Sequence, residues 1–513
     1  MSDRRIKKVV IAGGGTAGWV AAAALVKHLG PLIEVTLVES DDIGTVGVGE
    51  STIPTARTFH ELLGIYEQAF MRATNATFKL GISFENWGRI GDRYLHPFGS
   101  VGRAVWMGEF QHFWLQAREE GIAEPYGAYS LEHQAAMQGR FATGGEPALS
   151  HAYHLDATAY ARFLRSLAEP AGVRRIEGRI DHVVLDPENG FIAALHLANG
   201  DRVEGDLFID CTGFRALLIG AAMGVGFRDW GQWLATDRAL AVQTESVGPP
   251  VPYTRAIAHE AGWRWRIPLQ SRVGNGLVYA SAFMSDDEAR ARLLADIEGR
   301  PLFEPRPIRY ATGMRAEPWA RNCIALGLAA GFIEPLESTS IHLIQIAVTR
   351  LIQLFPFDGI SDAVVGRFNA QATREWEHVR DFIIMHYKLT ERDDTAFWRR
   401  CRDMPIPPSL AERIALFRES AQLGLGGEAL FRVDSWVSVM LGQRLEPAHW
   451  HQLARLLEPG ALRQALGDIR RAIDARLATL PAQERFIAGY CPAAPPSAAP
   501  ARGTVRISVC GRA

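Results

Sequence analysis

Few cysteines occur in this 513-residue sequence, and their spacing excludes several kinds of site. Zinc sites and thiol redox motifs need thiols close together, but the sequence has no CxxC pair. Disulfide frameworks belong mainly to small secreted domains that are rich in cysteine. We therefore expect reduced thiols, no disulfide, no metal ion and a cytoplasmic protein. The five cysteines are Cys211, Cys323, Cys401, Cys491 and Cys510.

The sequence also lacks an excess of either charge and any long apolar run. Lys and Arg total 55 against 57 Asp and Glu, a formal charge of -2, and no basic block would follow a phosphate backbone. The opening MSDRRIKKVVIAGGG has too short an apolar run for a signal peptide, and no later run approaches the ~18 residues of a membrane span. We expect neither nucleic acid nor a membrane as a partner.

What the sequence does contain is a regular alternation of strand and helix patterns. Residues 7–13 read as a strand, 14–29 as a helix and 33–40 as a strand, which indicates a parallel sheet. Asn-Gly turns at 189–190 and 199–200 indicate antiparallel strands. Helical periodicity dominates from about 340 to 485. We expect an α/β fold with a Rossmann-like domain, an antiparallel sheet and a mainly helical carboxy-terminal region.

The first chemical motif is GGGTAGW, which has GxGxxG spacing between the first strand and the helix. Glycines there let the chain approach a pyrophosphate at the helix N-terminus. An acid at the end of the next strand binds the ribose hydroxyls, and Glu39 lies 21 residues after Gly18. A similar spacing at 424–429 follows a helical segment, so we interpret it as a helix-terminating loop. The predicted dinucleotide residues are Gly13, Gly15, Thr16, Ala17, Gly18 and Glu39.

Two later segments also run from a strand into a glycine turn. Residues 206–218 contain a strand that ends in Asp210 before Gly213, and residues 323–338 run from a strand through a glycine turn to a helix. An NAD dehydrogenase would not need these two extra turns. They suit a flavoprotein in which FAD lies extended across the sheet.

The stretch GWRWRIP, residues 262–268, places two tryptophans two positions apart. In a strand, Trp263 and Trp265 project from the same face and form a wall of indole rings. Such a wall can be ordinary core, since tryptophans bury large areas. It can also separate two compartments, and the pattern alone leaves both alternatives open.

Six motifs in fixed order resemble the flavin-dependent halogenases of the tryptophan halogenase family. The resemblance extends to about residue 485 and implies bound FAD, oxygen, and chloride or bromide as co-substrate. It also implies that a separate NAD(P)H-dependent reductase supplies FADH2, and that hypohalous acid halogenates an electron-rich aromatic ring. The motifs are GGGTAGW, GVGEST (47–52), FKLGISFENW (78–87), GWRWRIP, GFIEPLESTSI (331–341) and RDFIIMHY (380–387).

The resemblance also implies roles for single residues. Lys79 corresponds to the catalytic lysine, and apolar neighbours should lower its pKa, so that it can donate a hydrogen bond or act as an amine nucleophile. Glu337 corresponds to the catalytic carboxylate, which stabilises the cationic ring and removes its proton. Glu334 is the competing candidate, although it can also simply begin the turn before Pro335.

The remaining residues that the resemblance implies belong to the cofactor, the halide and the substrate. Gly49 and Leu328 correspond to cofactor-binding positions, and Trp263 and Trp265 to the partition between flavin and substrate. The amides of Thr339 and Ser340 correspond to a halide site at a helix start. The family commonly has glycine at the position of Ser340, which leaves the halide preference open. His96 and Phe98 correspond to substrate-packing residues, although a proline turn explains them equally well.

His151 and His154 lie close enough in the sequence to suggest a metal pair. With Asp156 placed to cap the following helix, both histidines are better interpreted as structural. The expected organisation is an FAD-binding and catalytic region at 1–345, a helical substrate-covering region at 346–490 and a disordered tail at 491–513. The nucleotide-binding segments are expected at about 5–55, 150–230 and 310–345, with substrate-side segments between them. The oligomeric state stays open, with a homodimer as one alternative.

Two other functions compete with halogenation. A flavin-dependent aromatic hydroxylase shares the fold and cofactor but has no need of Lys79 together with the tryptophan wall. A non-catalytic flavin-binding protein needs neither Lys79 nor Glu337. The substrate is expected to be of the indole type rather than free tryptophan. Halogenases of free tryptophan grip its charged groups with a cluster that includes adjacent tyrosines, and the comparable stretch here, 426–443, has none.

Overall fold

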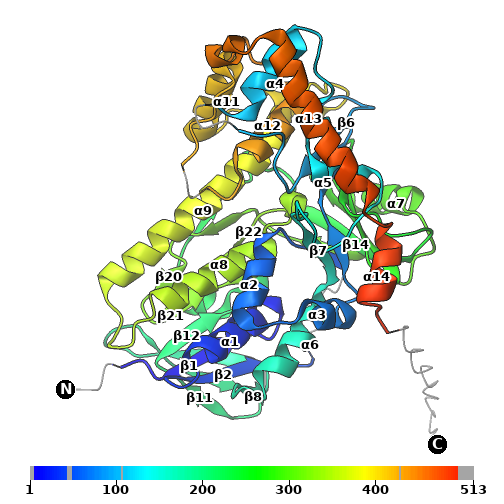
Figure 1. The fold of residues 1–513 in the computed structure, drawn as a ribbon. Coiled ribbons are helices and arrows are strands. Elements are labelled where there is room, and N and C mark those ends of the chain that lie inside the picture. The colour runs from blue at the N-terminus through cyan, green and yellow to red at the C-terminus, as the bar shows by residue number, and fades with distance from the viewer. Residues whose placement is uncertain (1–4, 43–48, 105–107, 427–428, 495–513) are drawn as a thin grey trace, which may run out of the picture.

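A computed structural model describes residues 5–42, 49–104, 108–426 and 429–494 of the chain. The amino-terminal strands and helices lie together at one end of the molecule, and several of the carboxy-terminal helices lie at the other (Figure 1). The long helix α9 (Asp362–Lys388) runs between these two parts. The mixed α/β fold with a helical carboxy-terminal region is therefore confirmed.

The nucleotide-binding part is built on a six-stranded sheet with the order β20-β21-β12-β1-β2-β8. Adjacent strands are parallel except at the edge, where β20 is antiparallel to β21. Strand β1 is buried on both faces, as its unbroken apolar run predicts for a parallel sheet. The strands are β20 (Trp319–Ala320), β21 (Cys323–Ala325), β12 (Leu207–Asp210), β1 (Lys8–Ala12), β2 (Glu34–Glu39) and β8 (Arg174–Glu177).

Helix α1 (Thr16–Leu29) follows the glycine turn and packs between α6 (Ala157–Ala168) and α8 (Ser340–Gln353). Its alanine-rich centre is buried, and the small side chains let neighbouring elements approach closely. The carboxyl ends of β1, β12 and β21 open toward the start of α1 and of α8, which is where parallel sheets bind ligands.

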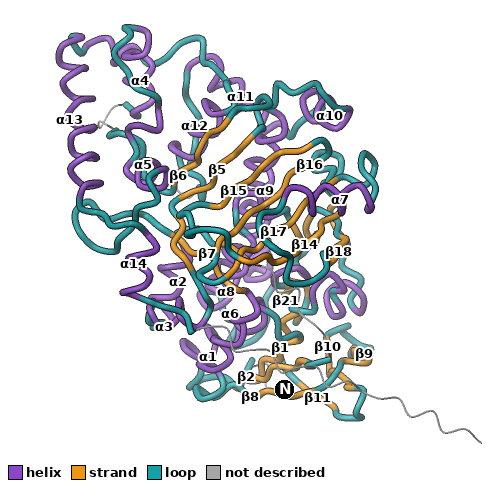
Figure 2. Tube along the Cα trace, turned by 90° about the vertical axis from the view of Figure 1, so that its right-hand side faces the viewer, coloured by secondary structure: helices purple, strands orange, loops and turns teal. Residues whose placement is uncertain are grey.

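A second sheet of seven strands has the order β18-β14-β17-β16-β15-β5-β6. All its pairs are antiparallel except β5 with β15. Figure 2 shows its central strands running side by side. The strands are β18 (Arg306–Arg309), β14 (Arg238–Glu245), β17 (Arg272–Tyr279), β16 (Gly262–Pro268), β15 (Thr254–His259), β5 (Gly81–Glu85) and β6 (Arg93–Pro97).

Three small antiparallel sheets complete the strands. The first, β3-β7-β4, joins β3 (Gly49–Ser51), β7 (Ala152–Asp156) and β4 (Thr77–Lys79) and packs against β16 and β17 of the seven-stranded sheet. The others are β11-β10-β9, with β11 (Arg202–Glu204), β10 (Ile192–Leu197) and β9 (Ile180–Leu185), and β13-β19-β22, with β13 (Phe227–Asp229), β19 (Gly313–Arg315) and β22 (Gly331–Phe332).

The remaining helices cover these sheets. Five of them precede α8 in the sequence: α2 (Thr55–Leu63), α3 (Glu67–Ala73), α4 (Phe110–Glu119), α5 (Leu131–Met137) and α7 (Asp286–Asp296). Five follow α9: α10 (Ala396–Asp403), α11 (Pro408–Ser420), α12 (Val433–Gly442), α13 (Pro459–Ala478) and α14 (Gln483–Tyr490). Short turns of 3-10 or π type are η1 (Tyr126–Tyr129), η2 (Gly213–Arg215), η3 (Leu217–Ala222), η4 (Gly327–Ala329), η5 (Pro335–Glu337) and η6 (Gln452–Leu456).

Most local predictions agree with the structure, and one needs correction. Both Asn-Gly turns join antiparallel strands, with positive φ at Gly190 and Gly200. The segment 323–338 does not pass directly from a glycine turn into a helix, because η4, β22 and η5 intervene before α8. Asp156 caps α6 as predicted, by accepting a hydrogen bond from the amide of Ala159 at 3.0 Å.

The expected boundaries stay predictions. A division after residue 345 falls inside helix α8. Residues 491–494 follow α14 directly, and Cys491 is buried, whereas 495–513 lie outside the described residues. Residues 427–428 of the glycine-containing stretch 424–429, and residues 47–48 of GVGEST, also lie outside the described residues. Among described helices, none is long and apolar enough to cross a bilayer.

Candidate active site

The glycine turn after β1 is shaped for close approach of the chain. Gly13 has a φ of +105°, and a Cβ there would overlap the carbonyl oxygen of Cys211. A Cβ at Gly18 would overlap the carbonyl oxygen of Gly13, so the helix can pack on the turn only with glycine. A Cβ at Gly15 would meet nothing within 4 Å. Gly15 therefore faces open space at the start of α1, which fits a pyrophosphate group.

Glu39 lies at the end of β2, where its carboxylate has several donors. Arg175 Nε lies 2.6 Å from Oε1, Arg165 lies 3.4 Å from the same oxygen, and Trp19 Nε1 lies 3.3 Å from Oε2. A carboxylate has about four lone-pair positions, so these contacts leave room for a ribose hydroxyl. The two arginines fix the orientation of the Glu39 carboxylate that a ribose would contact.

A cavity of about 980 Å³ extends from this turn along the carboxyl ends of the strands to the tryptophan strand β16. Pockets that hold whole cofactors are typically of this size and largely apolar. An extended dinucleotide therefore fits, with the glycines at one end and the indoles at the other. Predicted cofactor residues that line it are Gly13, Gly15, Thr16, Ala17, Glu39, Gly49 and Leu328.

The two tryptophans of β16 form one wall of this cavity. Trp263 and Trp265 project from the same face, and their ring centroids are 6.1 Å apart. A Cβ at Gly276 on the neighbouring strand β17 would overlap the Trp265 ring, so this glycine makes room for the indole. Within the described part of the chain, neither Lys79 nor Glu337 lines the cavity.

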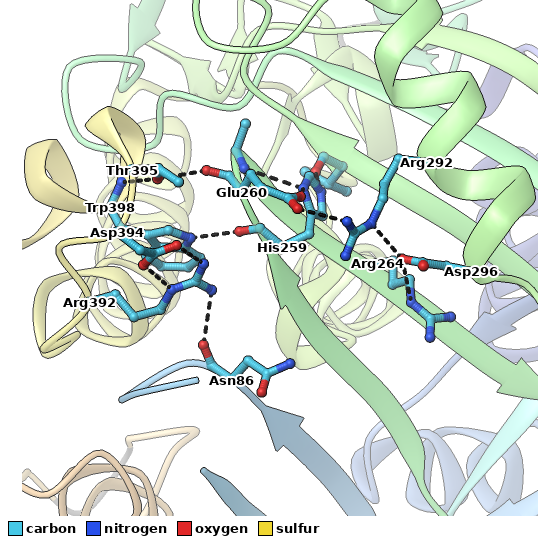
Figure 3. A network of polar contacts seen from close by, with 12 residues as sticks. Asn86, His259, Glu260, Arg264, Arg292, Asp296, Arg392, Asp394, Thr395 and Trp398 are labelled. Carbon is cyan, nitrogen blue, oxygen red and sulfur yellow. Dashed lines mark hydrogen bonds and ion pairs between the residues drawn. The ribbon is translucent and has the colours of Figure 1, made fainter. Parts of the chain in front are cut away.

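The hairpin turn before β16 is tied to two helices (Figure 3). Thr395, at the start of α10, donates to the Glu260 carbonyl at 2.8 Å, and Trp398 Nε1 donates to the His259 carbonyl at 2.6 Å. On the opposite side, Arg292 of α7 contacts the Glu260 carboxylate at 2.7 Å. These contacts hold the beginning of the tryptophan strand in place.

Lys79 ends strand β4 and is fully buried. Its Nζ donates to Ser338 Oγ at 2.6 Å and to Ser51 Oγ and the Thr52 carbonyl, both at 3.2 Å. It also lies 5.0 Å from the centroid of the Phe98 ring, within range of a cation–π contact. The amine is therefore held by neutral oxygens and an aromatic face.

Burial lowers the pKa of Lys79 from 10.5 to about 7, although the nearby charge of Glu337 acts in the opposite direction. Near neutral pH the amine is then present in both its charged and its neutral form. Such a lysine can donate a hydrogen bond or use its lone pair, whereas an exposed lysine is almost always protonated.

Glu337 ends the turn η5 and is also fully buried, between two imidazoles. His96 Nδ1 lies 2.9 Å from Oε2, and His386 Nε2 lies 2.9 Å from Oε1. Burial alone would raise the pKa of Glu337, but these histidines outweigh it and lower the pKa to about 2. The carboxyl group is therefore ionised at neutral pH and can stabilise a positive charge.

The histidine and phenylalanine of the HPF sequence lie beside this pair. His96 belongs to strand β6, which continues to Pro97, and the chain bends at Phe98 and Gly99 directly after it. Phe98 faces Lys79, and His96 packs near Phe382 and Phe431, whose stacked rings are 3.8 Å apart. Aromatic side chains thus lie next to Lys79 and to the histidine that contacts Glu337.

The sequence alone suggested that Glu334 simply begins a turn, but Glu334 also makes side-chain contacts. It is fully buried, and its Oε2 accepts hydrogen bonds from Trp263 Nε1 at 2.6 Å and from the Tyr387 hydroxyl at 2.7 Å. Burial raises its pKa to about 7. Glu334 therefore contacts the tryptophan wall, whereas Glu337 contacts the histidines.

The predicted halide residues lie at the start of α8. Thr339 is the N-cap and Ser340 the first residue of this 14-residue helix, and Ser340 lines the cavity. The preceding Ser338 adopts a left-handed conformation, with φ of 60°, and points its hydroxyl at Lys79. The helix start therefore faces the cavity, and the adjacent residue faces the lysine.

Four contributors to the site carried no assigned role in the sequence. Ser51 and Ser338 bind Lys79, and His386 and Tyr387 bind the two glutamates. All four lie inside motifs that the family resemblance had already singled out. Only the position within those motifs could have indicated them, because their partners are far away in the chain.

His151 and His154 have protein partners, in agreement with a structural role. His154 lies between the hydroxyls of Thr77, at 3.0 Å, and Thr254, at 2.9 Å. His151 lies 3.2 Å from Glu67. Among described residues, no cluster of three or more acidic, histidine or cysteine side chains could hold a metal ion.

Known proteins resemble this chain along most of its length. A family model described as tryptophan halogenase matches residues 8–459. Tryptophan 6-halogenase SttH from Streptomyces toxytricini is 35% identical over 534 residues, covering 95% of this chain and 99% of the relative. The solved structure of Xcc4156, a flavin-dependent halogenase from Xanthomonas campestris, has a TM-score of 0.95 at 54% identity and covers 96% of this chain and 100% of that one. BrvH, a flavin-dependent halogenase from Brevundimonas sp. BAL3, has a TM-score of 0.91 at 47% identity, with the same coverage of 96% and 100%.

Proposed function

Because this chain belongs to the tryptophan halogenase family of flavin-dependent halogenases, we propose that it halogenates an indole-type compound rather than free tryptophan. Halogenation of an aromatic substrate is the activity of the family; the substrate, the halide and the residue roles are the proposal. Chloride and bromide are the candidate halides. The observation that carries the proposal is that Lys79 and Glu337 are both fully buried and close enough to interact electrostatically, outside a cofactor-sized cavity that the two tryptophans line.

The residues present fit FAD as the cofactor. The glycine turn, Glu39, Gly49 and Leu328 would hold it in the cavity. When bound as FADH2, it would activate oxygen and oxidise the halide to hypohalous acid. Trp263 and Trp265 would then exclude the aromatic substrate from the flavin side, so that only a small oxidised halogen species passes.

Lys79 would bind that species on the substrate side. Its neutral form can attack hypohalous acid, forming an N–halogen bond while the hydroxyl leaves with a proton as water, and its charged form can donate a hydrogen bond to the acid. Electrophilic attack then makes the ring cationic. The Glu337 carboxylate stabilises that cation and accepts the ring proton.

A reconstituted assay tests the proposed activity. The mixture contains the protein, FAD, a separate flavin reductase, NADH, oxygen, indole and bromide, and is repeated with chloride and without halide. We expect a halogenated product that depends on halide and on the reductase. A hydroxylated product would support the hydroxylase alternative instead, and flavin binding with no product would support a carrier. We also propose that the protein is cytoplasmic, because flavin reductases and NADH are available there.

The protein is not expected to reduce its own flavin. A second dinucleotide fingerprint after a strand is missing from the sequence, so a nicotinamide has no predicted site. Mixing FAD-loaded protein with NADH under anaerobic conditions should leave the flavin absorbance near 450 nm unchanged for minutes. Addition of a catalytic amount of reductase should bleach it. Rapid bleaching by NADH alone would contradict the need for a partner.

We expect free tryptophan to be at least about tenfold worse than indole in kcat/KM. The stretch 426–443 supplies no tyrosine, and its Asp434, whose carboxyl group is partly buried, already accepts a hydrogen bond from the amide of Val101 at 3.3 Å. A zwitterion would lose more in desolvation than its ring gains when its charges find no partners.

Two analogues identify which charge is poorly tolerated. Tryptamine carries the ammonium group alone, and indole-3-propionate carries the carboxylate alone. If both charges are unmatched, each analogue should fall between indole and tryptophan in kcat/KM. A clear preference for tryptophan over indole, with the same halide, would show that other residues supply a clamp.

A further inference from the structure

Two carboxyl groups on one turn face opposite parts of the site. Glu334 and Glu337 flank η5, three residues apart, and both are fully buried. Adjacent residues near the end of α9 hold them separately: Tyr387 contacts Glu334, and His386 contacts Glu337. One helix end therefore supports both the tryptophan wall and the catalytic carboxylate.

The environments of these two groups differ in their hydrogen-bond donors. Glu337 lies between two imidazoles, whereas Glu334 accepts from an indole N–H and a phenol hydroxyl. Tyr310, Tyr387 and Cys401 lie close enough to feel its charge, and none of them is a cation. Opposite environments divide a carboxyl pair into different roles. Glu334 is therefore better suited to accept hydrogen bonds than to stabilise a cationic substrate.

Among the residues that the structure describes, Glu334 is the one hydrogen-bond partner of the Trp263 indole. This indole is almost completely buried, and an indole has a single donor, which is left unsatisfied without Glu334. A buried donor that loses its partner pays its full desolvation cost, which favours a different position of the ring. The neighbouring Trp265 differs, because its Nε1 has no hydrogen-bond partner among the described residues.

The acceptor itself is held rigidly. The Tyr387 hydroxyl donates to the same oxygen of Glu334, and the Tyr387 ring stacks on Trp398 at 6.0 Å and meets Trp87 edge-on at 5.2 Å. Trp398 in turn holds the hairpin turn before β16 (Figure 3). The same aromatic cluster therefore supports the beginning of the tryptophan strand and the acceptor of its first indole.

We propose that Glu334 is a positioning residue that fixes the indole of Trp263 across the boundary between the flavin cavity and the Lys79–Glu337 pair. The inference rests on the proposed function, since it assumes that the wall separates two compartments. Without this anchor the ring is free to rotate, and the barrier opens. Reducing equivalents are then lost, as each FADH2 and one oxygen molecule yield FAD and one hydrogen peroxide without halogenation.

The test is the coupling ratio, defined as halogenated product formed per FADH2 oxidised. Glu334→Leu should lower it at least about tenfold and raise hydrogen peroxide correspondingly. Glu334→Gln keeps an acceptor oxygen at the same place and should stay within about threefold of the unmodified protein. The FAD dissociation constant should be unchanged in both. Equal coupling in Glu334→Leu and the unmodified protein would overturn the proposal, and so would equal losses in the Leu and Gln variants.

A second variant keeps the test decisive if Glu334→Leu does not fold. Trp263→Phe removes the same donor and retains an aromatic ring in the wall, so it should uncouple to a similar degree. Combined with Glu334→Leu, where that variant folds, it should add little, because both changes remove one interaction. Full coupling in Trp263→Phe would overturn the proposal.

A spectroscopic measurement on the flavin-free protein separates this inference from the proposed function. The ultraviolet resonance Raman band that reports indole N–H hydrogen bonding is assigned to Trp263 from the difference between unmodified protein and Trp263→Phe. We expect a strong hydrogen bond in unmodified protein and in Glu334→Gln, and its loss in Glu334→Leu. A weakly bonded Trp263 in unmodified protein would overturn the assignment. If that bond is strong but no halide gives a product, the proposed function fails while the anchor stands.

Discussion

Lys79→Met is expected to reduce halogenation by at least about a thousandfold while FAD binding stays unchanged. Methionine keeps the length of the side chain but has no amine, so hypohalous acid finds neither a donor nor a nucleophile. Lys79 does not line the flavin cavity, which is why cofactor affinity should persist. Product formation with indole and bromide, and flavin titration, measure the two effects. Retained turnover would exclude Lys79 from the chemistry.

Two further variants interpret that result. Lys79→Arg keeps a cation and its donors but cannot become neutral, so inactivity in a folded Arg variant would favour the amine nucleophile. Lys27→Met changes an exposed lysine of α1 and should leave activity unaltered.

The stability of Lys79→Met should change with pH in a defined direction. The pKa of Lys79 is about 7 in the folded protein against the usual 10.5, so between these values the unfolded chain binds a proton that the folded chain does not. The unmodified protein should therefore gain about 1.4 kcal/mol of unfolding free energy per pH unit, relative to the variant, as pH rises from 7 toward 10. Denaturant unfolding at pH 7 and pH 9 measures the difference. A difference independent of pH would contradict the lowered pKa.

Glu337→Gln is expected to lower kcat by about a hundredfold or more. Glutamine has nearly the same shape but cannot stabilise the cationic ring as an anion or accept its proton. The low pKa of Glu337, about 2, means that the carboxylate form is present throughout the pH range in which the protein is folded and assayed. Single-turnover measurements with indole separate this chemical step from product release.

Glu337→Asp and a distant substitution provide the comparison. Aspartate retains the charge at a shorter reach and should give an intermediate rate. Glu484→Gln, at an exposed carboxyl group on α14, should be neutral. If Glu337→Gln were also neutral, the base would have to be sought elsewhere, and Glu334 would be the next residue to test.

The sequence was sufficient for features that depend on neighbouring residues. The strand, glycine turn and helix around Gly13, Gly15 and Gly18 are local, and so is the projection of two indoles from one face of β16. The family motifs also indicated Lys79 and Glu337. No local pattern could show that these two residues lie close together, since they are 258 residues apart in the sequence. Their roles await the experiments above.

Other contacts depend on tertiary structure and were not predictable. His96 reads as part of a proline turn until strand β6 pairs with β5, which keeps the chain extended as far as Pro97. Glu334 reads as the start of a turn until Trp263, 71 residues earlier, and Tyr387, 53 residues later, are placed beside it. A hydrogen bond between such distant residues leaves no trace in spacing or composition.

The parallel pairing of β5 with β15 has a consequence for how the chain folds. Ile82 pairs with Thr254, so this strand pair cannot form until more than 250 residues have left the ribosome. Contacts of such high sequence separation slow folding, because a long loop must close first. Until then β5 presents an unpaired edge that can capture another nascent chain. Synthesis rate and temperature should therefore govern the yield of active protein more strongly than its final stability does.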